Sequence, residues 1–103
     1  METKTIVLTK YLESDFLLYY SLVKEDKVMR YISGCGLTIE QARKKFKSIM
    51  EVNALHTKIG YFKVYNSTGE FIGDCKIERN TRDKTKLEIG FIFKENFWGK
   101  GIL

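Results

Sequence analysis

A short segment near the end of the chain, Asn96 to Gly101, carries the residues best suited to chemistry. It reads Asn-Phe-Trp-Gly-Lys-Gly and follows a segment, Leu87 to Phe93, whose pattern predicts a β-strand. Its two glycines let the backbone approach a ligand closely, and a helix is expected to start at or beyond Ile102. Exposed backbone N–H groups in such a loop favour binding of an anion. Glycine pairs also occur in ordinary turns, so the loop alone does not decide between these interpretations.

The strand predicted before this loop has two different faces. Alternate residues form an apolar and partly aromatic set, namely Leu87, Ile89, Phe91 and Phe93. Glu88, Gly90 and Ile92 stand between them, so a strand sends the two sets to opposite sides. Glu88 is the only carboxylate in the regular part of this strand, and Gly90 leaves room for a close approach.

The composition is that of a soluble globular domain or part of one. The chain has 103 residues, of which 44% are hydrophobic and 14% aromatic, and this argues against disorder. Its net charge of +5 permits a polyanionic partner, either a phosphate-bearing coenzyme or a nucleic acid. No run approaches the roughly 18 apolar residues that span a bilayer, and the first residues lack the features of a signal peptide. We therefore predict a cytoplasmic protein without membrane association.

The two cysteines and the single histidine suggest no metal site. Cys35 and Cys75 are far apart in the sequence and have no His or Cys partner at metal-binding spacing. We predict that both are reduced packing residues and that no metal is bound. His56 lies in a polar stretch without an acid, nucleophile or ligand beside it, so it is assigned no role.

The first half of the chain predicts one strand and a first helix. The β-branched run from Thr5 to Thr9 indicates the strand. Ser14 or Asp15 is placed to cap a helix that runs to about Lys24. A short amphipathic piece, Glu25 to Ile32, follows and ends in a loop with two glycines, and its residues are expected to be structural rather than substrate-contacting.

A capping box formed by Thr38 and Gln41 predicts the start of a second long helix. The apolar face of this helix is expected to comprise Ile39, Ala42, Phe46, Ile49 and Met50. The opposite face carries a basic cluster, Arg43, Lys44, Lys45 and Lys47. Nucleic-acid binding would suit this cluster, but no stacking aromatic residues stand among the lysines on that face. A solvated helix face is therefore preferred, and a nucleic-acid partner is disfavoured.

The second half of the chain predicts three consecutive strands. Tyr61 to Tyr65 and Phe71 to Ile77 flank a five-residue polar turn with a glycine, which indicates a hairpin. The charged segment Arg79 to Lys84 then leads into the strand Leu87 to Phe93. The predicted fold is α+β: a strand and two helices followed by a three-stranded antiparallel meander, with the first strand at its edge.

The amino-acid sequence of the last segment resembles the acetyl-CoA-binding motif of the GNAT family of N-acetyltransferases. The family motif consists of Gln or Arg, any two residues, Gly, any one residue, and then Gly or Ala. Its three fixed positions are occupied here by Asn96, Gly99 and Gly101, and Asn96 departs from the usual Gln or Arg. Two short sequences resemble those of the family branch that contains the Rim-type ribosomal-protein acetyltransferases. They are Phe-Trp-Gly-Lys-Gly at 97–101 and Val-Met-Arg-Tyr-Ile-Ser-Gly at 28–34. The element order is that of the first half of a GNAT domain, so the resemblance covers nearly the whole chain.

The resemblance implies roles for particular residues. The pantetheine arm of acetyl-CoA would bond to the backbone of Phe91, Ile92 and Phe93. The pyrophosphate would meet the loop residues, which are Asn96, Phe97, Trp98, Gly99, Lys100, Gly101 and Ile102. Glu88 would be the catalytic base that takes the proton of the acceptor amine, directly or through water. A solvent-facing Glu88, or one paired with Lys76 or Lys86, remains an open alternative.

The implied function is transfer of an acetyl group from acetyl-CoA to a primary amine. Because the next helix of the family would begin at Leu103, we expect residues 1–103 to form a single incomplete domain, truncated at the pyrophosphate-binding loop. The open edge of strand 87–93 would then favour self-association, with a dimer as the expected product. Two alternatives remain: a non-catalytic half-domain that self-associates, and a small basic nucleic-acid-binding domain that uses residues 43–47.

Overall fold

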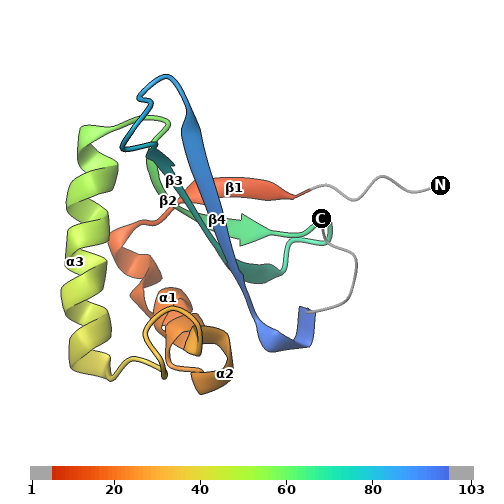
Figure 1. Cartoon of the computed structure of the whole chain (residues 1–103). Coiled ribbons are helices and arrows are strands. Elements are labelled where there is room, and N and C mark those ends of the chain that lie inside the picture. The colour runs from red at the N-terminus through yellow and green to blue at the C-terminus, as the bar shows by residue number, and fades with distance from the viewer. Residues whose placement is uncertain (1–5, 98–103) are drawn as a thin grey trace.

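The computed structural model describes residues 6–97, and its elements follow the predicted α+β order of a strand, helices and three strands (Figure 1). The first elements are β1 (Val7–Lys10), the 3-10 turn η1 (Glu13–Asp15), α1 (Phe16–Val23), α2 (Asp26–Met29) and α3 (Ile39–Leu55). They are followed by β2 (Gly60–Tyr65), β3 (Phe71–Arg79), β4 (Leu87–Phe93) and the 3-10 turn η2 (Glu95–Phe97). Within residues 6–97, no helix has both the length and the apolar character needed to cross a membrane.

The strands form one antiparallel sheet in the order β1-β2-β3-β4. This confirms the predicted meander and the edge position of the first strand. The hairpin between β2 and β3 turns around Asn66, whose Oδ1 accepts hydrogen bonds from the N–H groups of Thr68 (3.1 Å) and Glu70 (2.9 Å). Gly69 has a φ of +85° in this turn, a conformation that favours glycine.

The two long helices start in different ways. At α3, the Gln41 N–H donates to the Thr38 hydroxyl (3.2 Å) and the Thr38 N–H donates to the Gln41 side chain (2.9 Å), so the predicted capping box is confirmed. The predicted side-chain cap of the first helix is wrong. The Asp15 carboxylate accepts from the Leu12 N–H and pairs with Lys63 Nζ, both at 2.7 Å, because η1 runs directly into α1 and places this side chain toward β2.

The helices cover one face of the sheet, as Figure 1 shows. An aromatic cluster fills the space between them: Phe46 of α3 has ring-centroid distances of 5.7 Å to Tyr11, 5.4 Å to Tyr19 and 5.5 Å to Phe16. Ala42, Phe46 and Ile49 are buried, as predicted, whereas Ile39 is partly exposed. Edge-to-face aromatic contacts of this kind stabilise a core beyond the burial of apolar area.

The opposite face of the sheet carries a second, smaller cluster. Its buried members are Phe62, Val64, Ile72 and Cys75, against which Phe91 and Phe93 pack with their rings stacked at 5.4 Å. Burial raises the pKa of Cys75 to about 11, so this thiol is a neutral packing group, as predicted. Cys35 is exposed, which corrects the prediction that both cysteines are packing residues.

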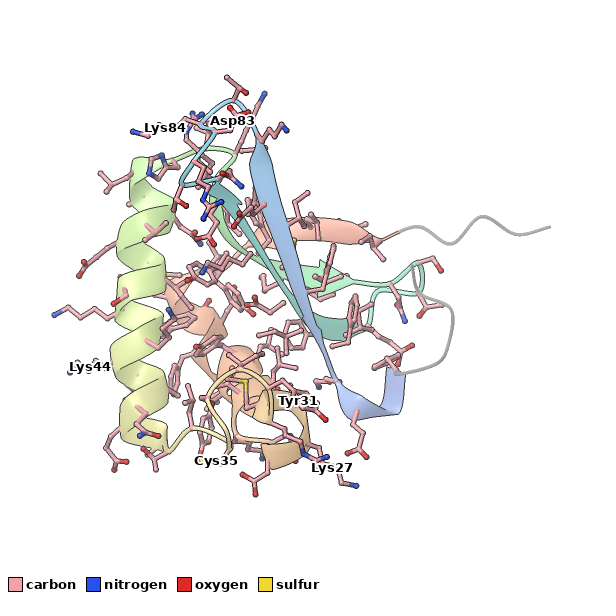
Figure 2. The ribbon with its side chains drawn as sticks, in the orientation of Figure 1. Lys27, Tyr31, Cys35, Lys44, Asp83 and Lys84 are labelled. Atoms are coloured by element: carbon pink, nitrogen blue, oxygen red, sulfur yellow. The ribbon has the colours of Figure 1, made fainter. Side chains whose placement is uncertain are left out.

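The basic cluster of α3 does not form one continuous surface. The Arg43 guanidinium lies 4.4 Å from the centroid of the Phe16 ring, on α1. Lys45 Nζ donates to the Tyr61 hydroxyl of β2 at 3.2 Å. Lys44 points away from the rest of the molecule (Figure 2). The described cations of α3 therefore have different neighbours.

Candidate functional site

A cavity of about 550 Å³ lies between the helices and the sheet. Its wall is mostly apolar and draws on every helix and on three strands. The lining residues are Tyr19, Val23, Met29, Ile32, Ser33, Leu37, Gln41, Lys45, Tyr61, Asp74, Lys76, Gly90, Phe91 and Ile92. Apolar cavities with a few polar groups are the usual form of a small-molecule site.

The segment between α2 and α3, residues 30–38, closes one side of the cavity. Its end is pinned by hydrogen bonds from Leu37 N–H to the Val23 carbonyl and from Gly36 N–H to the Asp26 carboxylate, both at 2.8 Å. A Cβ at Gly36 would lie 1.9 Å from the Lys24 carbonyl oxygen, so only glycine allows this approach. Met29, expected to be structural, is buried at the start of the segment and also lines the cavity.

Tyr31, by contrast, points into solvent. Its side chain is 91% exposed, and Figure 2 labels it in the segment that also carries Cys35. Arg30 is also exposed. Both residues therefore contribute little to the core, so the structural role expected for them is not seen, and neither lines the cavity.

Asp74 of β3 forms a buried acidic point on the cavity wall. It is 3% exposed, and the Tyr11 hydroxyl donates a hydrogen bond of 2.7 Å to its Oδ2. Burial raises the pKa of Asp74 to about 6, while the Tyr11 hydrogen bond and the charges of Lys45 and Lys76 oppose that shift. The pKa of Tyr11 is raised as well, by its burial and by the Asp74 charge, so the phenol stays a proton donor.

Two lysines stand on the cavity wall around Tyr61. Lys45 Nζ lies 5.2 Å and Lys76 Nζ 5.7 Å from the centroid of the Tyr61 ring. Lys76 Nζ also pairs with Glu78 Oε2 at 3.2 Å, at the exposed end of β3. Tyr61 itself is held by Asn53 of α3, whose side chain exchanges two hydrogen bonds of 2.9 Å with the Tyr61 backbone. The positive charges are therefore fixed near the same wall as Asp74.

The β3–β4 register determines which backbone groups of β4 face outward. Asn80 N–H donates to the Lys86 carbonyl and Lys94 N–H to the Ile72 carbonyl, which extends the ladder at both ends. Because hydrogen bonding alternates along an antiparallel pair, the backbone N–H and C=O groups of the even-numbered residues of β4 bond to β3. The backbone groups of Leu87, Ile89 and Phe91 are directed to the other side of β4. Within residues 6–97, β4 is one of the two edge strands of the sheet, and β1 is the other.

The structure brings some predicted site residues together and separates others. Phe91 and Ile92 line the cavity, and Phe93 packs on the opposite face of the sheet. Glu88 does not line the cavity; it is exposed, stands opposite Glu78, and accepts a hydrogen bond of 2.8 Å from the Asn80 amide. This donor is neither of the lysines considered from the sequence.

The predicted phosphate-binding loop is described only at its start. Phe97 ends η2, is partly buried and packs against the second cluster. The side chain of Asn96 and the residues Trp98, Gly99, Lys100, Gly101 and Ile102 lie outside the described residues. A 3-10 turn at Glu95–Phe97 was not expected from the sequence.

Sequence reasoning missed Asp74 and Tyr11. A signal was present, because aspartate is disfavoured in a β-strand and this one interrupts the apolar run of β3. Its significance depends on Tyr11, which precedes it by 63 positions. Within residues 6–97, no three His, Cys, Asp or Glu side chains gather in a way that could hold a metal ion.

Comparison with known proteins gives the family. Residues 5–103 match the model of the acetyltransferase (GNAT) domain. A GNAT-family acetyltransferase from Bacillus anthracis superposes with a TM-score of 0.71 at 20% identity, covering 93% of this chain and 54% of that one. A protein from Bordetella pertussis, described as a GnaT-family acetyltransferase, gives a TM-score of 0.68 at 17% identity and covers 99% and 62%, respectively.

These identities show a shared fold, and the chain spans 54% and 62% of the length of the two structures. The search of curated proteins found no match. The family model, however, covers almost every residue, including the glycine loop from which the family resemblance was drawn. The protein therefore belongs to the GNAT family of acetyltransferases.

Proposed function

We propose that the protein is an acetyl-CoA-dependent N-acetyltransferase that transfers an acetyl group to a primary amine in the cavity. The observation that carries this proposal is the lining of the cavity by Gly90, Phe91 and Ile92 of the edge strand β4. A thioester held along the outer side of β4 would meet an amine that enters from the helix-covered side. Holding the two reactants in this way is a large part of what such a catalyst must do.

The backbone of β4 suits the pantetheine arm of the cosubstrate. Each amide of that arm has one donor and one acceptor, which match the outward N–H and C=O groups of a strand. Phe91 offers such groups by the register, and Ile89 extends the same side. The backbone of Ile92 bonds to β3, so we assign Ile92 to the cavity wall. Phe93 remains a proposed contact at the end of the strand.

The glycine loop is the proposed pyrophosphate site. Asn96, Phe97 and the residues from Trp98 to Ile102 would surround the phosphates, with the backbone N–H groups as donors and Lys100 adding charge. The sequence Phe-Trp-Gly-Lys-Gly supports placing the protein near the Rim-type branch of the family.

The transfer needs a base for the amine. When bound, acetyl-CoA supplies a thioester: the nitrogen lone pair forms the N–C bond, the C–S bond breaks, and the thiolate keeps that electron pair and takes up a proton. Glu88 is the base proposed from the resemblance, and its exposed position would require a water relay to reach the cavity. This assignment competes with Asp74, which already lines the cavity.

A titration of the chain with acetyl-CoA, followed by NMR chemical shifts, tests the proposed function. We expect saturable shifts along β4 and release of free thiol when a primary amine is added. Lys100→Ala should weaken binding several-fold by removing charge near the phosphates, whereas Lys84→Ala, in the connection before β4, should not. Absence of both shifts and thiol release would contradict the proposal.

The outer side of β4 also supports a proposal of self-association. An edge strand offers backbone groups to a second chain, and Ile89 and Leu87 on it are 60% and 52% exposed. We expect a dimer in light scattering at tens of micromolar (on the order of usual assay concentrations). Ile89→Lys should shift it toward monomer, because a lysine blunts an edge. A monodisperse monomer of the unmodified chain would contradict self-association.

A further inference from the structure

Asp74 is the single carboxylate among the described residues that line the cavity. A buried carboxylate is costly unless its oxygens are hydrogen-bonded. Tyr11 donates one hydrogen bond, to Oδ2, whereas an ionised carboxylate can accept about four. The remaining acceptor capacity is available to a ligand with several N–H donors that enters the cavity.

We propose that Asp74 binds the ammonium group of the acceptor and takes its proton, and that the acceptor is a primary amine with one positive charge on a compact apolar body. This inference rests on the proposed acetyl transfer and names the substrate class for it. It assigns to Asp74 the role of base that the sequence suggested for Glu88.

The cavity wall supports the apolar body. The wall includes the apolar side chains of Val23, Met29, Ile32 and Leu37 on the helix side and Ile92 on the sheet side, together with the neutral polar residues Ser33 and Gln41. The described lining residues offer no second carboxylate for a second ammonium group, whose desolvation would be costly.

The charges on the wall support the restriction to one positive charge. Lys45 and Lys76 flank Tyr61 beside the same cavity, and their charges are felt at Asp74. A polyamine or an aminoglycoside would bring further cations against these two lysines. The same lysines help to keep Asp74 ionised, because a nearby positive charge favours the carboxylate.

The position of Asp74 suits proton transfer better than that of Glu88. Asp74 is the register partner of Ile92, so it lies one strand from the outer side of β4. Glu88 does not line the cavity, and it lies two residues from Gly90, the nearest lining residue of β4, which is about 7 Å at a rise of ~3.4 Å per residue. That span exceeds direct hydrogen-bond reach.

The proton step is simple in this geometry. An N–H proton passes from the ammonium group to an oxygen of Asp74, and the nitrogen keeps the electron pair with which it attacks the thioester carbonyl. With a pKa of about 6, Asp74 is mostly ionised at neutral pH and yet more basic than an exposed carboxylate.

The test measures amine binding in the absence of acetyl-CoA, so that it is independent of the cosubstrate titration. The chain is titrated at pH 7.5 (about 1.5 units above the Asp74 pKa) with 2-phenylethylamine, its neutral analogue 2-phenylethanol, and spermidine. Asp74→Asn should weaken 2-phenylethylamine binding about tenfold or more and leave 2-phenylethanol unchanged. Glu78→Gln, a half-exposed carboxylate on the same strand that does not line the cavity, is the matched control and should change neither.

A second variant tests the site without touching Asp74. A Cβ at Gly90 meets no atom within 4 Å, so Gly90→Leu can enter the cavity without a backbone clash and should abolish binding of both aromatic probes. The proposal is overturned if 2-phenylethylamine does not bind, if Asp74→Asn binds it unchanged, or if Glu88→Gln alone loses it. Tighter binding of spermidine than of 2-phenylethylamine would overturn the substrate class. If only the acetyl-CoA titration fails, the proposed function is contradicted, but the measured binding of the amine at Asp74 still stands.

Discussion

Asp74 and Glu88 are carboxylates on neighbouring strands and on the same face of the sheet, yet their surroundings differ in almost every respect. Asp74 is buried under the helices, where Tyr11 donates to it and its pKa is raised to about 6. Glu88 lies at the open end of the β3–β4 pair, where it faces water and the Asn80 amide. The comparison shows that the helix cover, and not the strand, determines which of the two carboxylates is buried.

The largest effect is expected from removal of that cover. Phe46→Ala takes a ring out of the aromatic cluster with Tyr11, Tyr19 and Phe16, and should lower the free energy of unfolding by about 3–5 kcal/mol. Urea unfolding followed by circular dichroism measures it. Lys44→Ala, on the solvent side of the same helix, should change stability by less than about 0.5 kcal/mol. Equal losses in both variants would contradict the role of the cluster.

The second prediction sharpens the contrast between the two carboxylates through pH. Between about pH 4 and 6, folded Asp74 keeps a proton that the unfolded chain releases, so its contribution to stability falls as pH rises through this window. Asp74→Asn should therefore gain stability relative to the unmodified chain, by up to about 3 kcal/mol between pH 4 and 7 at ~1.36 kcal/mol per pKa unit. Tyr11 and Tyr19, whose pKa values are raised, stay protonated throughout, and Lys45 and Lys76 oppose the shift.

Thermal unfolding of both chains at several pH values gives this difference directly. A constant difference for Asp74→Asn would show that Asp74 titrates like an exposed carboxylate.

The third and smallest effect concerns two glycines that stand on opposite sides of the β3–β4 pair. A Cβ at Gly73 would lie 2.1 Å from the Ile92 carbonyl oxygen, whereas one at Gly90 meets open space. Gly73→Ala should cost about 1–3 kcal/mol by overpacking, and Gly90→Ala should be neutral or slightly stabilising, because alanine loses less backbone entropy than glycine. Chemical denaturation of the pair measures both, and the reverse order would contradict the strand spacing.

Local patterns were enough to predict most of the fold. The capping box of Thr38 and Gln41, the turn at Asn66 and the strand Leu87–Phe93 each depend on residues close in sequence, and each is confirmed. The wrong cap at Asp15 shows the limit of such rules, because Lys63 competes for that carboxylate from β2.

The candidate site could be predicted only in part. The alternation of β4 indicated the face that Glu88 occupies, but it carried no information on how far the helices extend over that face. Asp74 needed the opposite kind of information, since its burial and its hydrogen bond depend on Tyr11, 63 positions away. A site assembled by tertiary packing has no local motif from which it could be read.

The segment of residues 30–38 has a consequence for how this protein can change over time. Its ends are secured to α1 and α2 by backbone contacts that make no demand on the side chains between them, apart from the glycine at position 36. Substitutions at Arg30, Tyr31 or Cys35 can therefore accumulate at little cost in the free energy of folding. A substitution at Ile32 or Ser33 would instead change the lining of the cavity directly. Other members of the family are the natural donors for exchange of this segment as a unit.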